Sequence, residues 1–343
     1  MRDYFLRRIL LIPPTLIGVT LIVFAITRFV PGGPMERAIM EAQIADASQG
    51  GGGSGGARGG EGTGLSEDQL NELKAYYGFD KPMIVAYFSW LGKLVRGDLG
   101  VSTRYQDSVW SQISQRFPIS IFYGLTTMII TYGICIPLGM LKALKHRTAL
   151  DTYSSILVFC GYAIPGYALG SLLLLFFSVE LGWFPMGGFK SIYFEELSLW
   201  EKAVDIVDHA VLPLICYLVG SFAVTTLLMK NHLMDNMAAD YMRTAVAKGV
   251  SFKSAVFHHA LRNSMIPIAT TFGQNVSLIL TGSFLIETIF DIDGIGLLGI
   301  SAVLDRDYPV VMGIVFLSSL LLLLGNVISD ALVALVDPRI RFK

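Results

Sequence analysis

Charged residues are scarce in this chain. Asp, Glu, Lys and Arg make up 15% of its 343 residues, whereas they make up about a quarter of a typical soluble domain. The mean hydropathy is correspondingly high, at +0.58. This composition excludes an ordinary soluble domain and predicts a protein that is embedded in a lipid bilayer.

Several catalytic and nucleotide-binding motifs are missing as well. The sequence has no Gly-x-x-x-x-Gly-Lys-Ser/Thr loop, the motif that cradles the phosphates of a nucleotide. The apolar runs contain no Asp-Asp pair, no His-Glu-x-x-His and no nucleophile elbow, which argues against an intramembrane protease or lipid transferase. We therefore expect a non-catalytic chain that holds no cofactor and no metal ion of its own.

Cysteine is also rare. The three cysteines, Cys135, Cys160 and Cys216, all lie within apolar runs. Their odd number and their spacing fit neither a disulfide framework nor a metal site. We interpret them as small apolar residues inside the membrane.

Long uncharged runs are abundant instead. Six runs contain no Asp, Glu, Lys or Arg, and they cover residues 9–27, 117–141, 152–179, 210–229, 263–286 and 308–329. Each has about the 20 residues that a helix needs to cross the hydrocarbon core of a bilayer. The sequence therefore predicts six transmembrane helices. A cleaved signal peptide is the alternative for the first run, but the run is longer than a usual signal core and is interrupted near its start by Pro13 and Pro14.

The distribution of basic residues predicts the orientation. With the amino terminus inside, the inner segments carry fourteen Lys and Arg residues, whereas the two short outer loops carry only Lys190, Lys202 and Arg306. Both termini should therefore face the cytoplasm. The outer segment 28–116 is also rich in basic residues, but segments of this length are translocated largely regardless of charge.

The outer segment has an internal order of its own. Residues 50–64 are almost entirely glycine and polar residues, which predicts a flexible stretch, either a natural insertion or an engineered linker. Helices are predicted over residues 66–77 and 83–95. The second would either lie on the outer leaflet through Phe88, Trp90, Leu91 and Leu94 or pack against the ends of the spans.

Residues 240–267 predict a polar helix, a sharp turn and a second helix between two apolar runs. Residues 241–248 favour a helix, Gly249 can adopt the positive φ that ends it, and Ser251 can cap the next helix. Basic residues gather here, namely Arg243, Lys248, Lys253 and Arg262. Such a rigid elbow suits the transmission of movement from a soluble partner to the membrane helices. A solvated amphipathic connector is the alternative.

Some residues within or beside the runs leave two interpretations open. Pro137, Pro165, Pro213 and Pro267 either kink helices along an aqueous path or are ordinary irregularities of membrane helices. An ionisable group deep in the membrane would mark the substrate path, but Glu287 and Asp330 lie near the ends of their runs, where we expect them to be solvated.

A series of motifs resembles one family along almost the whole chain. The motifs are Tyr4-Phe5-Leu6-Arg7-Arg8-Ile9-Leu10, Pro31-Gly32-Gly33-Pro34, Tyr77-Gly78-Phe79-Asp80-Lys81-Pro82, Gly97-Asp98-Leu99-Gly100, Tyr162-Ala163-Ile164-Pro165, the elbow, Gly282-Ser283-Phe284-Leu285-Ile286-Glu287, Gly294-Ile295-Gly296-Leu297-Leu298-Gly299, Arg306-Asp307-Tyr308-Pro309-Val310 and Asp337-Pro338-Arg339-Ile340. They follow one another as in the dipeptide, oligopeptide and nickel permeases of ABC importers. The chain is most similar to the Yej-type permeases, which import peptides and the peptide-nucleotide toxin microcin C.

The resemblance implies an all-α integral membrane protein with the fold of an ABC type I importer permease and six transmembrane helices. The expected organisation is a first helix (1–30), a periplasmic segment (31–115), a five-helix core (116–336) with a cytoplasmic coupling loop (230–265), and a cytoplasmic tail (337–343). The coupling loop would comprise Tyr241, Arg243, Thr244, Ala245, Ala247, Lys248, Gly249, His259 and Asn263. The wider family often has Glu-Ala-Ala before the turn glycine, where this chain has Arg243-Thr244-Ala245.

The implied function is ATP-driven import of peptides across the bacterial inner membrane by alternating access. The implied partners are a second homologous permease, two ATP-binding subunits or one fused ATPase that bind ATP and Mg, a periplasmic peptide-binding protein and membrane lipid, but no nucleic acid. The alternatives are a permease for nickel or another small solute, a secondary transporter, and an intramembrane enzyme. The residues that contact substrate cannot be assigned from the sequence.

Overall fold

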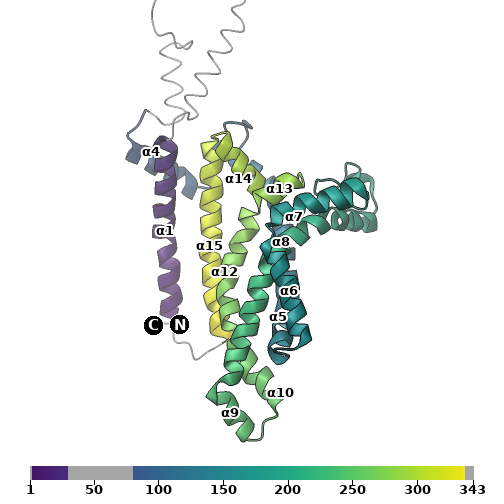
Figure 1. Cartoon of the computed structure of the whole chain (residues 1–343). Coiled ribbons are helices and arrows are strands. Elements are labelled where there is room, and N and C mark those ends of the chain that lie inside the picture. Colours follow the sequence, from purple (N-terminus) through teal and green to yellow (C-terminus); the bar gives the residue numbers. More distant parts are fainter. Residues whose placement is uncertain (1, 30–79, 337–343) are drawn as a thin grey trace, which may run out of the picture. The chain divides into compact units, whose positions relative to one another are not determined.

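The computed structural model describes residues 2–29 and 80–336 (Figure 1). The predicted Gly-rich stretch 50–64, the predicted helix 66–77 and the predicted tail 337–343 lie outside the described residues. So do the motifs at 31–34 and 337–340 and the first part of the motif at 77–82.

The described residues form helices joined by short connections, with one isolated antiparallel bridge between Val101 and Ser108. The α-helices are α1 (Arg2–Phe29), α4 (Met83–Val95), α5 (Val109–Leu144), α6 (Ala149–Ala163), α7 (Gly166–Leu173), α8 (Leu199–Ala238), α9 (Asp240–Ala247), α10 (Phe252–Ala255), α11 (Leu261–Ser264), α12 (Ile266–Thr281), α13 (Phe284–Ile289), α14 (Ile295–Leu304) and α15 (Tyr308–Val336). Leu174–Glu180 and Val256–Ala260 are π-helical.

Four helices in the described ranges are long and apolar enough to cross a membrane: α1, α5, α8 and α15. They coincide with four of the predicted runs and extend beyond them, because polar residues at the ends of a membrane helix continue it into the headgroup region. Helix α8 begins with a capping box in which Ser198 and Glu201 bond each other's backbone amides, so the start of this helix is well defined.

The other two predicted runs are not continuous helices. In the run 152–179, α6 and the pair formed by α7 and its π-helical continuation meet at 92°. Ile164 is extended at the break, as expected for a residue before a proline. In the run 263–286, α12 ends at Thr281, and Gly282 has a φ of +54° before α13 begins. The described part thus has four long helices and one bent pair, and the prediction of six spans is not confirmed.

The chain divides into two compact units. The larger consists of Met1–Pro13, Gln115–Leu298 and Leu317–Lys343, and the smaller of Pro14–Ser114 and Gly299–Phe316. In the larger unit, residues of α5, α8 and α13 form an apolar cluster around Tyr123, Cys216 and Ile286. The α12 and α15 helices are joined where the Ser329 hydroxyl donates to the Ala269 carbonyl at 2.5 Å.

One buried carboxylate joins three helices of the larger unit. Asp151, in the first turn of α6, is 5% exposed and accepts from Lys230 Nζ of α8 at 2.7 and 2.8 Å. Lys142 Nζ of α5 lies 3.3 Å from the same carboxylate and donates to the Asp151 carbonyl and to the Ser154 and Ser155 hydroxyls. Lys142, one of the fourteen basic residues counted to the inner segments, is fully buried. We call Asp151, Lys142 and Lys230 the charge cluster.

A second ion pair in the larger unit joins α1 to α15. Arg8 Nε is 2.6 Å from Asp330 Oδ2, and the Tyr4 hydroxyl donates to the same oxygen at 2.9 Å. The expectation that Asp330 is simply solvated is therefore wrong. A carboxylate at the end of an apolar helix is stabilised here by an arginine more than 300 residues away in the sequence.

In the smaller unit, α4 packs against α1. The Tyr87 hydroxyl donates to the Ile17 carbonyl at 3.0 Å and lies 2.9 Å from Thr20 Oγ1, and its ring meets Phe24 edge to face. Of the predicted apolar face, Leu94 is buried, Trp90 and Leu91 pack at the margin of this cluster, and Phe88 is 60% exposed. These contacts support packing against a span, one of the two interpretations that the sequence left open.

A buried aspartate organises the loop before α5. Asp307 precedes α15 and accepts from the Ser102 hydroxyl and from the backbone amides of Thr103 and Arg104 at 3.1 and 3.3 Å. Arg104 also pairs with Asp305. The loop is therefore held to the start of α15 within the smaller unit.

Candidate functional site

The predicted elbow is present at one end of the larger unit, where α9 and α10 extend beyond α8 and α12 (Figure 1). Helix α9 ends in a left-handed turn at Gly249, whose φ is +90°. The Gly249 amide donates to the Val246 carbonyl and the Val250 amide to the Ala245 carbonyl, the paired bonds of a Schellman motif. Ser251 then caps α10 by accepting from the Ser254 amide. Helix, turn and cap are confirmed as predicted.

The elbow has one buried and one exposed side. Met242, Ala255, Val256 and Ala260 are buried in a cluster with Leu233 of α8 and other residues of α5, α8 and α12. The apolar side therefore fixes the elbow to the membrane helices, which lets a force applied to the exposed side reach them.

The nine residues assigned to the coupling loop lie together in this region. Ala245 and Asn263 are half-buried, and the exposed residues are Tyr241, Arg243, Thr244, Ala247, Lys248, Gly249 and His259. The Tyr241 hydroxyl donates to Asn236 Oδ1 at 2.7 Å, and Thr244 Oγ1 donates to the Asp240 carbonyl. His259 lies in the π-helical segment Val256–Ala260, with its side chain exposed. The exposed side of the elbow therefore carries basic residues together with three exposed apolar side chains, Val246, Phe252 and Phe257.

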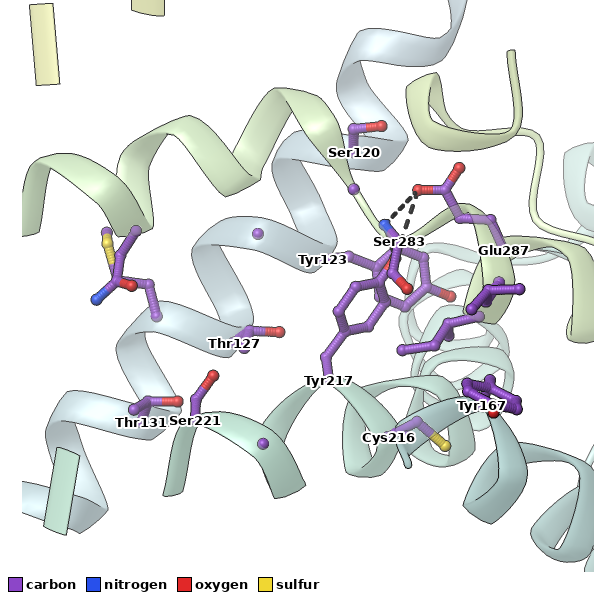
Figure 2. Close-up of a pocket in the computed structure, with 18 of the residues that line it drawn as sticks. Ser120, Tyr123, Thr127, Thr131, Tyr167, Cys216, Tyr217, Ser221, Ser283 and Glu287 are labelled. Atoms are coloured by element: carbon purple, nitrogen blue, oxygen red, sulfur yellow. Dashed lines mark hydrogen bonds between the residues drawn. The ribbon is translucent and has the colours of Figure 1, made fainter. Parts of the chain in front are cut away.

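A cavity of about 410 Å³ lies inside the larger unit (Figure 2). This volume is within the range of pockets that hold small ligands. Residues of α5, α7, α8, α12 and α13 line it, together with the break between the last two helices. Most of the lining is neutral, with hydroxyl, amide and aromatic groups, and Glu287 is its one carboxylate within the described residues.

Helix α5 supplies a polar stripe to this cavity. Ser120, Tyr123, Thr127 and Thr131 recur at helical spacing, so their side chains fall on one face over about three turns. The sequence analysis missed this stripe. The hydroxyl residues at intervals of three or four within an otherwise apolar run were the available signal.

Glu287 is buried beside the cavity, not solvated as predicted. It is 2% exposed and accepts from the Leu297 amide at 2.6 Å, from the Ser283 amide at 3.3 Å and from the Tyr217 hydroxyl at 3.4 Å. Figure 2 shows Ser283 between Tyr217 and Glu287, at the break between α12 and α13. A side chain at Gly282 would overlap the Glu287 carboxylate, so the glycine gives this carboxylate room as well as the positive φ.

Two tyrosines stand between this carboxylate and the rest of the cavity. The rings of Tyr123 and Tyr217 are stacked, with centroids 5.8 Å apart. At the other end of the lining, Asn275 of α12 donates to the Tyr132 hydroxyl at 2.6 Å. The cavity thus has a charged, aromatic end and an uncharged, amide-containing end.

Comparison with known proteins shows to which family this chain belongs. Residues 135–342 match the family described as the binding-protein-dependent transport system inner membrane component. This chain belongs to that family. It is a transmembrane permease subunit of an ABC importer, and such subunits are non-catalytic because the ATPase is in separate subunits. The resemblance drawn from the motifs is confirmed.

Several relatives match the permease over its whole length. It is 36% identical to the peptidoglycan transport system permease protein YejB of Agrobacterium fabrum, over 100% of this chain and 99% of the relative. It is 37% identical to the inner membrane ABC transporter permease protein YejB of Escherichia coli O157:H7 and 32% identical to the dipeptide transport system permease protein DppB of Escherichia coli K12, in both cases over 100% of each chain. The similarity to Yej-type permeases is confirmed as well.

Proposed function

We propose that this permease carries peptides from the periplasm to the cytoplasm by alternating access. The observation that carries the proposal is the full-length similarity to permeases named for dipeptide, oligopeptide and peptidoglycan transport. The cavity supports it, because neutral hydroxyl and amide groups suit main-chain amides, which every peptide has whatever its side chains.

The proposed assembly contains a second homologous permease, two ATP-binding subunits or one fused ATPase, and a periplasmic peptide-binding protein. ATP and Mg would be bound by the ATPase. Both termini would lie in the cytoplasm, on the side of the elbow. This orientation is supported by the basic residues of the elbow and of the amino-terminal segment, since cytoplasmic segments are enriched in Lys and Arg.

The elbow is the proposed contact with the ATPase. Its exposed face, from Tyr241 to Lys248 and around His259, would receive the movement of the ATPase when ATP binds. The packed face would pass this movement to α8 and α12 through the cluster around Met242 and Leu233. A Schellman turn suits this role, because its two paired hydrogen bonds fix the angle between the arms.

Uptake by cells tests the substrate. Cells with and without the gene would be given labelled peptides of two to six residues, and nickel in parallel. We expect loss of peptide uptake alone in the deletion strain, restored by the wild-type gene. The peptide-nucleotide toxin would be tested next. Loss of nickel uptake with peptide uptake intact would leave the permease fold in place and overturn the peptide assignment.

A further inference from the structure

Three hydroxyl groups in the cavity have no hydrogen-bond partner within the described residues. They are those of Tyr123, Thr127 and Thr131, spaced four residues apart on α5. Tyr123 and Thr131 are each 3% exposed, and all three residues line the cavity. Buried polar groups are nearly always hydrogen-bonded, because leaving one unpaired costs free energy. A row of unpaired hydroxyls on residues that line one cavity is therefore a candidate contact for a ligand with complementary polar groups at a regular spacing.

The spacing of the row matches an extended peptide. Four residues of an α-helix rise by about 6 Å. Two residues of an extended chain span roughly 6.6 Å. Successive hydroxyls of the row can therefore contact alternate residues of an extended peptide that lies along α5. A hydroxyl can both donate and accept, so it can bond either the N–H or the carbonyl of that residue.

Among Asp, Glu, Lys, Arg and His, the described lining contains only Glu287, so any charge at this end of the cavity is negative. The hydrogen bonds to Glu287 come from the backbone amides of Ser283, Gly296 and Leu297 and from a tyrosine hydroxyl, which are uncharged donors. No Lys, Arg or His lines the cavity in the described part of the chain. No cation from the lining therefore balances Glu287 when it is ionised, and in a low-dielectric site a positive group of the ligand would stabilise the ionised form.

We propose that this cavity binds a peptide by its amino-terminal end. The α-ammonium group lies toward Glu287, and the main-chain amides that follow lie along Tyr123, Thr127 and Thr131. The inference rests on the proposed function, because it takes a peptide as the substrate. It adds a prediction about selectivity: the permease recognises the amino terminus and the main chain, and side chains contribute little.

The test compares two substrates in the assembled complex. The complex with its ATPase and binding protein is reconstituted in proteoliposomes, and uptake is measured for a labelled tripeptide and for the same tripeptide acetylated at its amino terminus. The quantity of interest is the ratio of the two uptake rates. The binding protein is identical in wild type and variants, so its own preference cancels when ratios are compared.

Glu287→Gln keeps the size and the acceptor oxygen but removes the charge. We expect the preference for the free amino terminus to fall by about tenfold or more, because a hydrogen bond to a charged group is lost. An unchanged ratio in a variant that still transports would overturn the role of Glu287. Copurification of the ATPase shows beforehand whether the variant assembles.

The hydroxyl row is tested separately with Thr127→Val and Thr131→Val. These changes keep the side-chain shape, and we expect both to slow the uptake of the two tripeptides by the same factor. Thr270→Val is the matched control, because Thr270 is exposed on α12 outside the cavity and bonds its own helix. If the cavity variants transport as well as the control, the hydroxyl row does not bind substrate.

The same experiment separates this inference from the proposed function. A wild-type complex that transports neither tripeptide but transports nickel would refute peptide import itself, and the inference with it. A wild-type complex that transports peptides, with uptake ratios unaffected by Glu287→Gln, would refute the inference alone.

If Glu287→Gln does not assemble, the wild-type complex is tested with an N-trimethylated tripeptide, which keeps the positive charge of the amino terminus. We then expect uptake closer to the free tripeptide than to the acetylated one, and uptake as low as the acetylated one counts against the charge interaction.

Discussion

The charge cluster allows a quantitative prediction. Asp151→Asn removes the carboxylate that pairs with the buried Lys142 and the largely buried Lys230. Breaking a buried ion pair by removing one partner costs about 3–5 kcal/mol, because it leaves a buried charge uncompensated. Lys142 keeps three neutral acceptors, so most of the loss should arise at Lys230, whose Nζ bonds both carboxylate oxygens.

The measurement is the apparent melting temperature of the assembled complex in lipid nanodiscs, followed by tryptophan fluorescence at one fixed scan rate. A loss of 3–5 kcal/mol corresponds to a fall on the order of 10 °C. Asp240→Asn is the matched control. Asp240 also pairs with a basic residue, Arg243, but its side chain is 94% exposed, so we expect almost no change.

A double variant tests the physical reason. In Asp151→Asn with Lys230→Gln the unpaired charge is gone, so the combined loss should be smaller than the sum of the two single losses by about 0.5–3 kcal/mol. A fall for Asp151→Asn no larger than that for Asp240→Asn would refute the reasoning, and so would strict additivity in the double variant.

Three further changes probe other parts of the chain. In Gly249→Val the added side chain would find free space, but a β-branched residue would be forced to a φ of +90°, at a cost of about 1 kcal/mol or more. We expect normal membrane insertion of this variant and lower substrate-stimulated ATP hydrolysis. Stimulation equal to that of the wild type would remove the assigned role of the turn. Asp307→Asn weakens the hydrogen bonds to the amides of the loop before α5, at a cost of about 1–3 kcal/mol in stability. Hydrogen exchange of the Thr103 and Arg104 amides should therefore become faster. Unchanged protection of these amides would contradict this reasoning. Gly282→Ala places a methyl group against the Glu287 carboxylate, so peptide uptake should fall, and wild-type uptake would show that this contact is dispensable.

The elbow was predictable from the sequence because its determinants are local. A helix-favouring stretch, one glycine and one serine specify the helix, the turn and the cap within about fifteen residues, and the structure has each of them in place. Long apolar runs likewise predicted α1, α5, α8 and α15, since length and composition alone decide them.

The cavity was not predictable in the same way. The burial of Glu287 depends on a break at Gly282 and on the amide of Leu297 ten residues later, and neither contact leaves a periodic signal in the sequence. The sequence analysis counted Lys142 only as one basic residue of the inner segments, because charge counting ignores partners, and its partner Asp151 lies across a turn. Hydropathy measures how apolar a run is, but it does not tell whether the run is straight, as the break between α6 and α7 shows.

That break has a mechanical consequence. The end of α6 and the start of α7 meet at Ile164 and Pro165, and a proline has no N–H to contribute to a helical ladder. Rotation about this joint therefore changes two backbone torsions and breaks no α-helical hydrogen bond. Both arms pack on α8. Resistance to such a rotation would come from side-chain packing along α8, so mutations on the α8 surface are expected to change how easily the two arms rotate without altering the joint itself.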